Sequence, residues 1–366
     1  MSLSSDGVST VTSSSPEGRR RVPLRWAVPL LLFTLSLGCL LSVLMSLAFG
    51  SEHIPVDVVW QVVSTHVRGE SSDGSPWDAI VWELRLPRAL LALVVGAGLA
   101  LAGAGMQTLV RNPLADPYLL GLSSGASVGA TLVITTGVLS GAGIYSLSLG
   151  ALLGALMAAG TVYLVAMAQG GLTPMRLVLS GVVLSSAFSA MASFLIFLGE
   201  DSRAASSVLF WMLGSLNGAT WTTIGPVTVL VLCSGLLLWA GHSWLDALSC
   251  GPETAAALGV PVRGVRLTLF VLLGLLVGGL VAISGGIGFV GLIVPHAARL
   301  LVGATHRVMI PVAAVAGGLF LVWVDVVARV AAAPQEMPLG VVTGVIGAPV
   351  FLALMGRRSY SFGGAR

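Results

Sequence analysis

The first candidate for a catalytic site is the motif formed by Gly121, Ser123 and Gly125, which has the G-x-S-x-G spacing of a serine nucleophile. That motif requires a strand before it and a histidine and an acid as partners, but here it opens an apolar segment and the next histidine is His242. The chain has no H-E-x-x-H zinc motif, and without any lysine it cannot form a G-x-x-x-x-G-K-[ST] phosphate loop. Its three cysteines form no C-x-x-C pair. The sequence therefore predicts no catalytic residue, no metal site and no cofactor bound by this chain.

The elements that carry these residues must lie in a membrane. The chain has 366 residues, of which 56% are hydrophobic and 9% are charged, and its mean hydropathy is +0.98. A soluble domain carries about 25% charged residues, so this chain cannot build a surface that faces water. The composition excludes a soluble enzyme, a nucleic-acid-binding domain and a disordered scaffold. It predicts an all-α polytopic membrane protein whose outer surface contacts lipid.

Stretches without charge predict ten transmembrane helices. A span needs about 20 apolar residues, and the stretch 117–175 is long enough for two spans with a turn at 137–143. The stretch 267–298 breaks at Ser284, Gly285 and Gly286, which predicts a full span followed by a shorter one. The remaining spans are predicted within 26–51, 89–110, 177–199, 222–240, 308–329 and 338–356.

The arginines predict the orientation of these spans. Arginine clusters at both ends of the chain, and cytoplasmic loops carry an excess of basic residues, so both termini are expected in the cytoplasm. This arrangement requires an even number of spans. The outer side then holds the acidic loop 51–84 and only five arginines, namely Arg68, Arg85, Arg88, Arg203 and Arg329.

We expect residues 1–22 to form a flexible cytoplasmic tail and residues 23–366 to form a single ten-helix membrane domain. Arg85 and Arg88 open one glycine-rich run, and Arg263 and Arg266 open another. Each run continues through a cluster of small residues to a proline, and the two runs would cross in opposite directions. This similarity between the two runs predicts an inverted internal repeat, although chance similarity between glycine-rich helices would also produce it.

The membrane spans hold almost no charge that could couple transport to an ion gradient. Asp325 lies four residues before Arg329, which favours an i,i+4 ion pair, and His296 is expected to be structural. Energy for transport would have to come from another protein. The segment 242–266 contains a short predicted helix with Pro252 and Glu253 in its first turn and Gly259 after its end. This helix is either a simple connector or a docking element on the cytoplasmic face.

Several longer motifs then occur in a fixed order along the chain. They are Arg85 to Arg88, Asn112 to Gly121, Ser123 to Ser127, Gly285 to His296, Ala328 with Arg329, and Glu336 to Gly344. With them, the chain from about Trp82 to Met355 resembles the permease family of type II ABC importers, which take up ferric siderophores, haem and cobalamin.

The resemblance implies partners as well as a fold. It implies a dimer of permeases, either two copies of this chain or one copy with a close paralogue. Two ATPase subunits would use ATP and magnesium, and a periplasmic or lipid-anchored binding protein would deliver the substrate. The chain would lie in the cytoplasmic (inner) membrane among lipids, with no nucleic acid as a partner.

The resemblance also assigns site residues. Arg85, Arg88 and Arg329 match arginines that dock the binding protein, although Glu83 and Asp325 could instead bind Arg88 and Arg329 internally. Asn112 and Leu114, with Thr173 and Pro174, match the cytoplasmic gate. The residues that match the helix contacting the ATPase are Gly251, Pro252, Glu253, Thr254, Ala255, Ala256, Leu258 and Gly259.

The sequence leaves the substrate open. We expect a ferric siderophore, with haem or cobalamin as the alternatives within the same family. A stand-alone secondary transporter is an alternative of another class, which an ATPase that co-purifies would exclude. An intramembrane hydrolase that uses Ser123 is a third alternative, which labelling by a serine-reactive probe would support.

Overall fold

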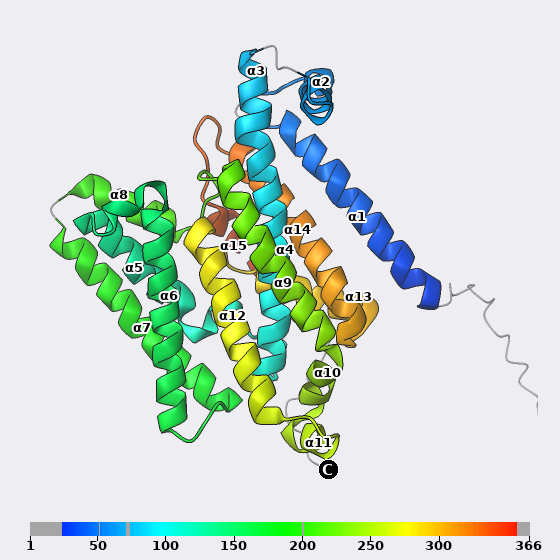
Figure 1. The fold of residues 1–366 in the computed structure, drawn as a ribbon, viewed down its shortest axis with the longest axis vertical. Coiled ribbons are helices and arrows are strands. Elements are labelled where there is room, and N and C mark those ends of the chain that lie inside the picture. Colours follow the sequence, from blue (N-terminus) through cyan, green and yellow to red (C-terminus); the bar gives the residue numbers. More distant parts are fainter. Residues whose placement is uncertain (1–23, 51, 71–73, 200, 357–366) are drawn as a thin grey trace, which may run out of the picture.

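Ten of the described helices form the membrane bundle. The computed structural model describes residues 24–50, 52–70, 74–199 and 201–356, so the predicted tail 1–22 lies outside the described residues. Seven of the helices are long and apolar enough to span a membrane and three are shorter. They are α1 (Leu24–Ala48), α4 (Leu86–Val110), α5 (Leu122–Thr136), α6 (Ser146–Ala168), α7 (Pro174–Leu198), α9 (Trp221–Ala240), α12 (Val262–Ser284), α13 (Val290–Val302), α14 (His306–Val330) and α15 (Leu339–Gly356) (Figure 1). The predicted all-α fold with ten spans is confirmed.

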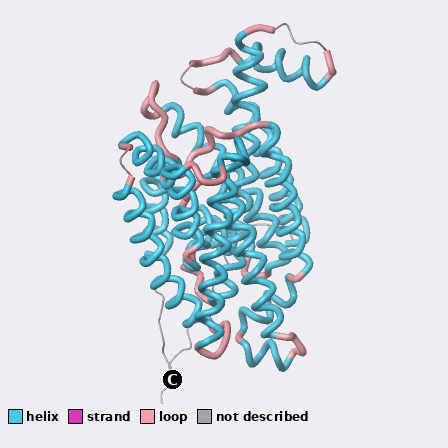
Figure 2. Tube along the Cα trace, turned by 60° about the vertical axis from the view of Figure 1, so that its left-hand side comes forward, coloured by secondary structure: helices cyan, strands magenta, loops and turns pink. Residues whose placement is uncertain are grey.

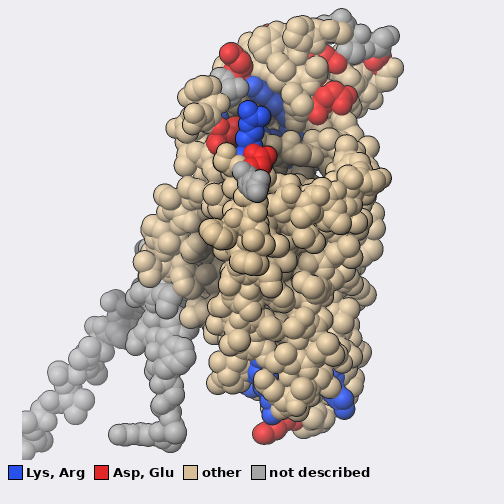
Figure 3. All heavy atoms as spheres, turned by 90° about the vertical axis from the view of Figure 1, so that its left-hand side faces the viewer, with Lys and Arg blue, Asp and Glu red and all other residues tan. Residues whose placement is uncertain are grey.

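On the face drawn in Figure 3, charged side chains lie at the two ends of the bundle. In the described residues the chain is helical with loops and no strand (Figure 2). Figure 3 shows arginine and acidic side chains gathered at the two ends, with a broad uncharged band between them. Such a band has the composition that contact with lipid tails requires.

Helix α4 is the central element of the bundle. Within its most apolar window 78% of residues are buried, compared with 22% for α1 and α9 and 11% for α7. Gly96 of α4 packs against Gly317 of α14, and Gly103 packs against Gly291 of α13, so closely that a Cβ on either α4 glycine would collide with a backbone carbonyl. Small residues therefore bring these helices together, as is usual where no hydrophobic force drives helix association in lipid.

Two of the short spans begin inside the protein. Helices α5 and α13 have 15 and 13 residues, fewer than the about 20 needed to cross a bilayer. The chain turns sharply before each, with positive φ at Gly121 and Gly285. The Tyr118 hydroxyl joins the two turns, since it donates to the Ile287 carbonyl and accepts from the Ile287 N–H, both at 3.1 Å. Irregular backbone at this depth is tolerated because it is enclosed by protein.

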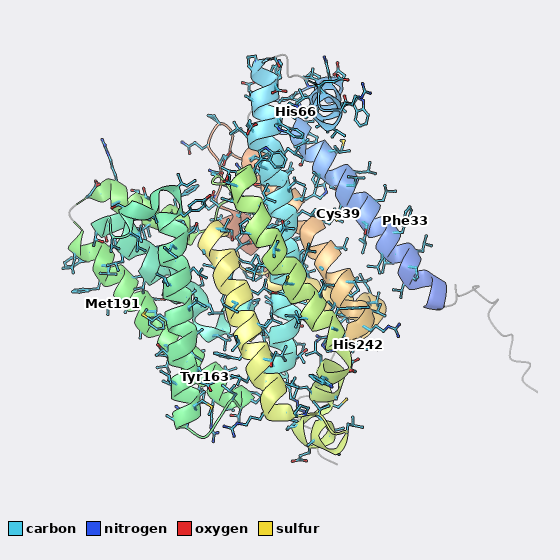
Figure 4. All side chains as sticks on the ribbon, in the orientation of Figure 1. Phe33, Cys39, His66, Tyr163, Met191 and His242 are labelled. Atoms are coloured by element: carbon cyan, nitrogen blue, oxygen red, sulfur yellow. The ribbon has the colours of Figure 1, made fainter. Side chains whose placement is uncertain are left out.

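Helical elements also lie beyond the band at the end opposite α11. The acidic segment 51–84, which the sequence analysis treated as a loop, contains the helix α2 (Val56–Val67), the short α3 (Pro76–Asp78) and the π-helix η1 (Ala79–Arg85). Ser75 caps α3 and Pro76 begins it, which fixes the start of the helix. From there one continuous helix runs through η1 and α4 to Val110. His66 of α2 stacks on Trp82 of η1 with ring centroids 4.1 Å apart (Figure 4), which fixes α2 against this extension.

A further short helix, α8 (Ser202–Met212), joins α7 to α9. The opposite end of the bundle carries two short helices, α10 (His242–Cys250) and α11 (Pro252–Ala257) (Figure 1). From there α12 runs in the direction opposite to α4, as the proposed inverted repeat requires. The repeat itself stays a prediction.

Candidate functional site

The structure brings the three predicted docking arginines together at one end of the bundle. Arg85 ends η1, Arg88 lies in the first turn of α4, and Arg329 lies in the last turn of α14. All three line a cavity of about 370 Å³. Figure 3 shows arginine atoms in a hollow near this end, with acidic side chains beside them.

Two carboxylates hold Arg88 and Arg329 in place. Asp325, which is 1% exposed, contacts Arg88 Nε at 2.8 Å through Oδ1 and Arg329 Nε at 3.0 Å through Oδ2. Glu336 contacts Arg88 Nη1 at 2.9 Å, and its side chain is 35% exposed. Asp325 therefore bridges two helices, while Glu336 is the most accessible member of the cluster.

Arg85 and Arg329 also bind the end of α1. Arg85 donates to the Leu47 carbonyl at 2.7 Å and to the Glu52 carbonyl, and Arg329 donates to the Phe49 carbonyl at 2.8 Å. The last carbonyls of a helix have no partner inside the helix, and cations are favoured there by its dipole. The two guanidinium groups thus complete the C-terminus of α1. Gly50 makes room for this, since a Cβ there would lie 2.6 Å from Arg85 Nη2.

The structure therefore contains internal ion pairs of the arginines, which the sequence offered as the alternative to docking of a binding protein. Asp325 pairs with both Arg88 and Arg329, whereas Glu83 forms no ion pair with either in the described part of the chain. Glu336 was missed as a partner, although it begins one of the motifs that carried the resemblance. Docking by these arginines stays a prediction, and it must operate on side chains that already have partners.

At the opposite end, α11 has the caps that the sequence predicted. Pro252 occupies its first turn, Glu253 follows, and Gly259 has a φ of +79° just beyond the helix. The Gly259 N–H bonds to the Ala256 carbonyl and the Val260 N–H to the Ala255 carbonyl, both at 2.9 Å, which is a Schellman motif.

The outer face of α11 is free for a partner. Glu253, Thr254, Ala256, Leu258 and Gly259 are exposed, with Leu258 at 68%. Gly251 and Ala255 are buried, so they face this chain and shape the helix from within. An exposed leucine and alanine on a polar end suit a shallow apolar groove on another protein.

A hydrogen-bonded chain ties α10 to the two helices of the arginine cluster. Asp246 of α10 accepts from the His306 backbone N–H at 2.9 Å and lies 2.6 Å from His306 Nδ1. His306 Nε2 lies 2.8 Å from the Thr108 hydroxyl of α4. Sequence analysis missed this set because its members are 60 and 198 residues apart along the chain.

The four predicted gate residues are not brought together within one chain. The Asn112 side chain accepts from the Leu114 N–H at 2.9 Å in a local turn, and Asn112 lines a cavity of about 510 Å³. Thr173 and Pro174 begin α7, and Thr173 lines a different cavity of about 610 Å³. The structure thus places Asn112 and Thr173 beside different cavities, and their role as a gate stays a prediction.

The connection between α4 and α5 carries a half-buried acid. Asp116 accepts from the Tyr118 N–H at 2.8 Å and so caps the short helix η2 (Pro117–Leu120). This carboxyl shapes the turn that positions Tyr118 against Ile287.

Helix α7 presents hydroxyl groups on an exposed apolar face. Ser186 and Ser193 donate to the carbonyls four residues earlier, at 3.2 and 3.0 Å, and Ser189 donates to the Ser124 hydroxyl at 3.3 Å. Met191 projects from the same helix, 51% exposed (Figure 4). This surface is mildly polar and uncharged, and the other described helices leave it uncovered.

The glycines of the G-x-S-x-G motif around Ser123 are buried in the helix bundle. Ser123 opens α5 after a helical turn and not after a strand, so it lacks the strand-to-helix turn that a nucleophile elbow needs. Gly125 of that motif packs against Gly154 of α6. In the described part of the chain, no group of three or more His, Cys, Asp and Glu could hold a metal ion.

The fold and these two charged ends define an all-helical, polytopic membrane permease. The FecCD transport family matches residues 38–357, and the chain belongs to that family. It is 38% identical over 334 residues to the Fe(3+)-citrate import system permease protein YfmD of Bacillus subtilis, covering 90% of this chain and 94% of the relative.

Two further relatives carry other substrates in their names. The vitamin B12 import system permease protein BtuC of Salmonella paratyphi A is 40% identical, with 94% of this chain and 98% of the relative covered. The hemin transport system permease protein HmuU of Yersinia pestis is 38% identical, with 88% and 96% covered. A solved metal-chelate type ABC transporter in an inward-facing conformation matches with a TM-score of 0.79 and 33% identity, covering 90% of this chain and all of that one.

Proposed function

We propose that this chain is the membrane permease of an ATP-driven importer that carries a ferric siderophore across the cytoplasmic membrane. The family and the relatives named for iron, haem and cobalamin import support this class of substrate. The passage is expected to bind its substrate weakly, because α5, α6 and α7 offer hydroxyls and apolar groups with no charge inside the membrane.

Orientation follows from the arginines. The end with α11 also holds Arg111, Arg176, Arg263, Arg266, Arg299 and Arg307, which favours the cytoplasm for that end and for both termini. The arginine cluster at the other end then faces the side from which substrate arrives.

The observation that carries the proposal is that α4 and α14 connect the two ends. Arg88 and Arg329 lie on these helices at one end, and Thr108 and His306 of the same helices bind Asp246 beside α11 at the other. A binding protein that contacts the cluster and an ATPase that contacts α11 would therefore act on one rigid pair. The glycine contacts between α4 and α14 make that pair tight.

The proposed assembly contains two permease chains, two ATPase subunits and one binding protein. The uncovered face of α7 is the surface that we assign to the second permease chain, with the substrate passing beside its serines. ATP and magnesium are used by the ATPase subunits, and this chain is not itself an enzyme.

Haem and cobalamin are the alternative substrates, favoured by the hemin and vitamin B12 permeases that match nearly the whole chain. The test is ATP-dependent uptake by proteoliposomes that contain the complete transporter and its binding protein. Equal concentrations of a radiolabelled ferric siderophore, haem and cobalamin are compared. Uptake of the siderophore in preference to both others supports the proposal, whereas preference for haem or cobalamin replaces it, and uptake without any ATPase would favour a secondary carrier.

A further inference from the structure

Two cavities between α6 and α12 join into one groove near the end that carries α11. The first, of about 610 Å³, is lined by the arginines Arg263 and Arg266 and by the loop that precedes α7. The second, of about 250 Å³, continues along the same two helices into the uncharged band. Tyr163 and Leu267 line both cavities, so they form one continuous surface. Figure 4 shows Tyr163 on the lower part of α6, toward this end.

The first cavity is cationic and uncompensated. Neither Arg263 nor Arg266 forms an ion pair with a carboxylate in the described part of the chain. Arg266 donates to the Leu172 carbonyl at 3.3 Å, and its Nε is buried with no hydrogen-bond partner. Two guanidinium groups with free donors at the edge of a membrane favour a phosphate group.

The second cavity is apolar and has the shape of a groove because side chains are missing from its walls. Gly160 of α6 faces open space, since a Cβ there would meet nothing within 4 Å. Gly274 of α12 lines the opposite wall, beside the exposed Val271 and Leu275. A groove of this kind on the outside of two membrane helices accommodates an acyl chain.

We propose that this groove binds one anionic phospholipid, with its phosphate on Arg263 and Arg266 and an acyl chain along Gly160 and Gly274. Basic pockets between membrane helices bind anionic headgroups in this way. The charge and the groove point to the same occupant, because a soluble anion would use only the first cavity and a neutral lipid would leave the arginines unpaired. The headgroup would then hold the loop before α7, which contains Thr173, against the start of α12.

The test is native mass spectrometry of the purified full-length chain, titrated with phosphatidylglycerol, with phosphatidylcholine or with inorganic phosphate. We expect phosphatidylglycerol to bind at least about tenfold more tightly than phosphatidylcholine. Replacing both Arg263→Gln and Arg266→Gln should weaken phosphatidylglycerol binding about 30-fold, which corresponds to about 1 kcal/mol for each arginine. Arg307→Gln, an exposed arginine at the same end outside both cavities, is the matched control and should change it little.

A second variant tests the groove without touching the arginines. Gly160→Leu places a side chain in the apolar cavity, at a position where a Cβ meets nothing within 4 Å, and should weaken phosphatidylglycerol binding to a similar degree. The proposal is overturned if Gly160→Leu binds phosphatidylglycerol normally, because the arginines then hold only a phosphate. Inorganic phosphate that displaces the lipid at low concentration would overturn it for the same reason. Equal loss in Arg307→Gln would also overturn it, since it would show non-specific attraction to a basic surface.

Discussion

The arginines of the outer cluster have different sets of partners, and these partners determine what a substitution tests. Among the described residues, Arg85 donates to backbone carbonyls alone, Arg329 to carbonyls and Asp325, and Arg88 to the two carboxylates Asp325 and Glu336. A charged group of the binding protein can reach Arg88 most simply by replacing Glu336, which is the exposed partner. Arg88 is therefore the residue at which docking should be tested.

We predict that Arg88→Glu slows association of the binding protein about tenfold and that Glu336→Gln speeds it about threefold. The reason is that long-range attraction between the arginine cluster and acidic groups of the binding protein governs how fast the two proteins meet. Association is measured by surface plasmon resonance with the transporter in nanodiscs at two salt concentrations. Added salt should reduce the difference between the variants. Association rates that match the unmodified protein for both variants would show that these charges are purely structural.

Asp325→Asn should act on folding instead. The change leaves Arg329 buried without its counter-charge, and breaking such a pair costs about 3 kcal/mol. Thermal unfolding in detergent should show a clear loss of stability, while Glu336→Gln, at a partly exposed position, should lose little. Equal loss in both variants would mean that Asp325 does not bridge the helices.

Arg85→Ala should release the end of α1. Hydrogen bonds from a charged donor contribute about 1.5–3 kcal/mol each, so the loss should lower the unfolding temperature measurably. Arg68→Ala is the control, because Arg68 is 68% exposed and its contact with Glu70 spans 4.0 Å. Exposed pairs of this kind contribute less than about 1 kcal/mol. A control that is as unstable as Arg85→Ala would contradict the role assigned to Arg85.

At the scale of elements, short helices lie at the ends of the bundle, and long helices connect the two ends. Helix α11 has only six residues, yet its proline start and its glycine end satisfy its free backbone groups. Such a helix should keep its shape when a partner binds it. Asp246 and His306 connect α10 to α14 through hydrogen bonds.

We predict that Ala256→Asp with Ala257→Asp separates ATP hydrolysis from transport. Both alanines are exposed on α11, so the chain should still fold and insert, while two carboxylates would be costly to bury in an apolar groove of the ATPase. ATP hydrolysis and substrate uptake are measured together in proteoliposomes. Ala304→Asp, at another exposed alanine of the same end, serves as the control. Normal coupling in the double variant would remove α11 from the proposed contact.

At the scale of the whole molecule, the described part of the chain encloses no charged substrate site within the band. The uncharged hydroxyls of α7 lie on a surface that the other described helices leave open, and the predicted gate residues Asn112 and Thr173 line two separate cavities. In the proposed assembly the passage lies between two chains and lacks charged ligands, so it should release its substrate readily.

The isolated permease should therefore bind its substrate weakly, with a dissociation constant of about 100 µM or above, as expected from few polar contacts. Isothermal titration of the purified permease, compared with the binding protein alone, measures this directly. A submicromolar constant for the permease would contradict a passage without a tight site.

The sequence by itself determined the ten spans, because lipid requires long uncharged stretches and the chain has few charges to interrupt them. It also determined α11, since Pro252, Glu253 and Gly259 mark a helix start and end through local backbone chemistry. The spacing of Asp325 and Arg329 also predicted their i,i+4 pair. Only the tertiary structure decided the other partners of the arginines: Asp325 and Glu336 for Arg88, and the carbonyls of Leu47, Phe49 and Glu52 for Arg85 and Arg329. The same holds for Asp246, His306 and Thr108, and for the groove beside Gly160. Local rules fix helices along the chain, whereas these contacts depend on which helix faces meet, and in lipid that is decided by close packing at glycines such as Gly96 and Gly317.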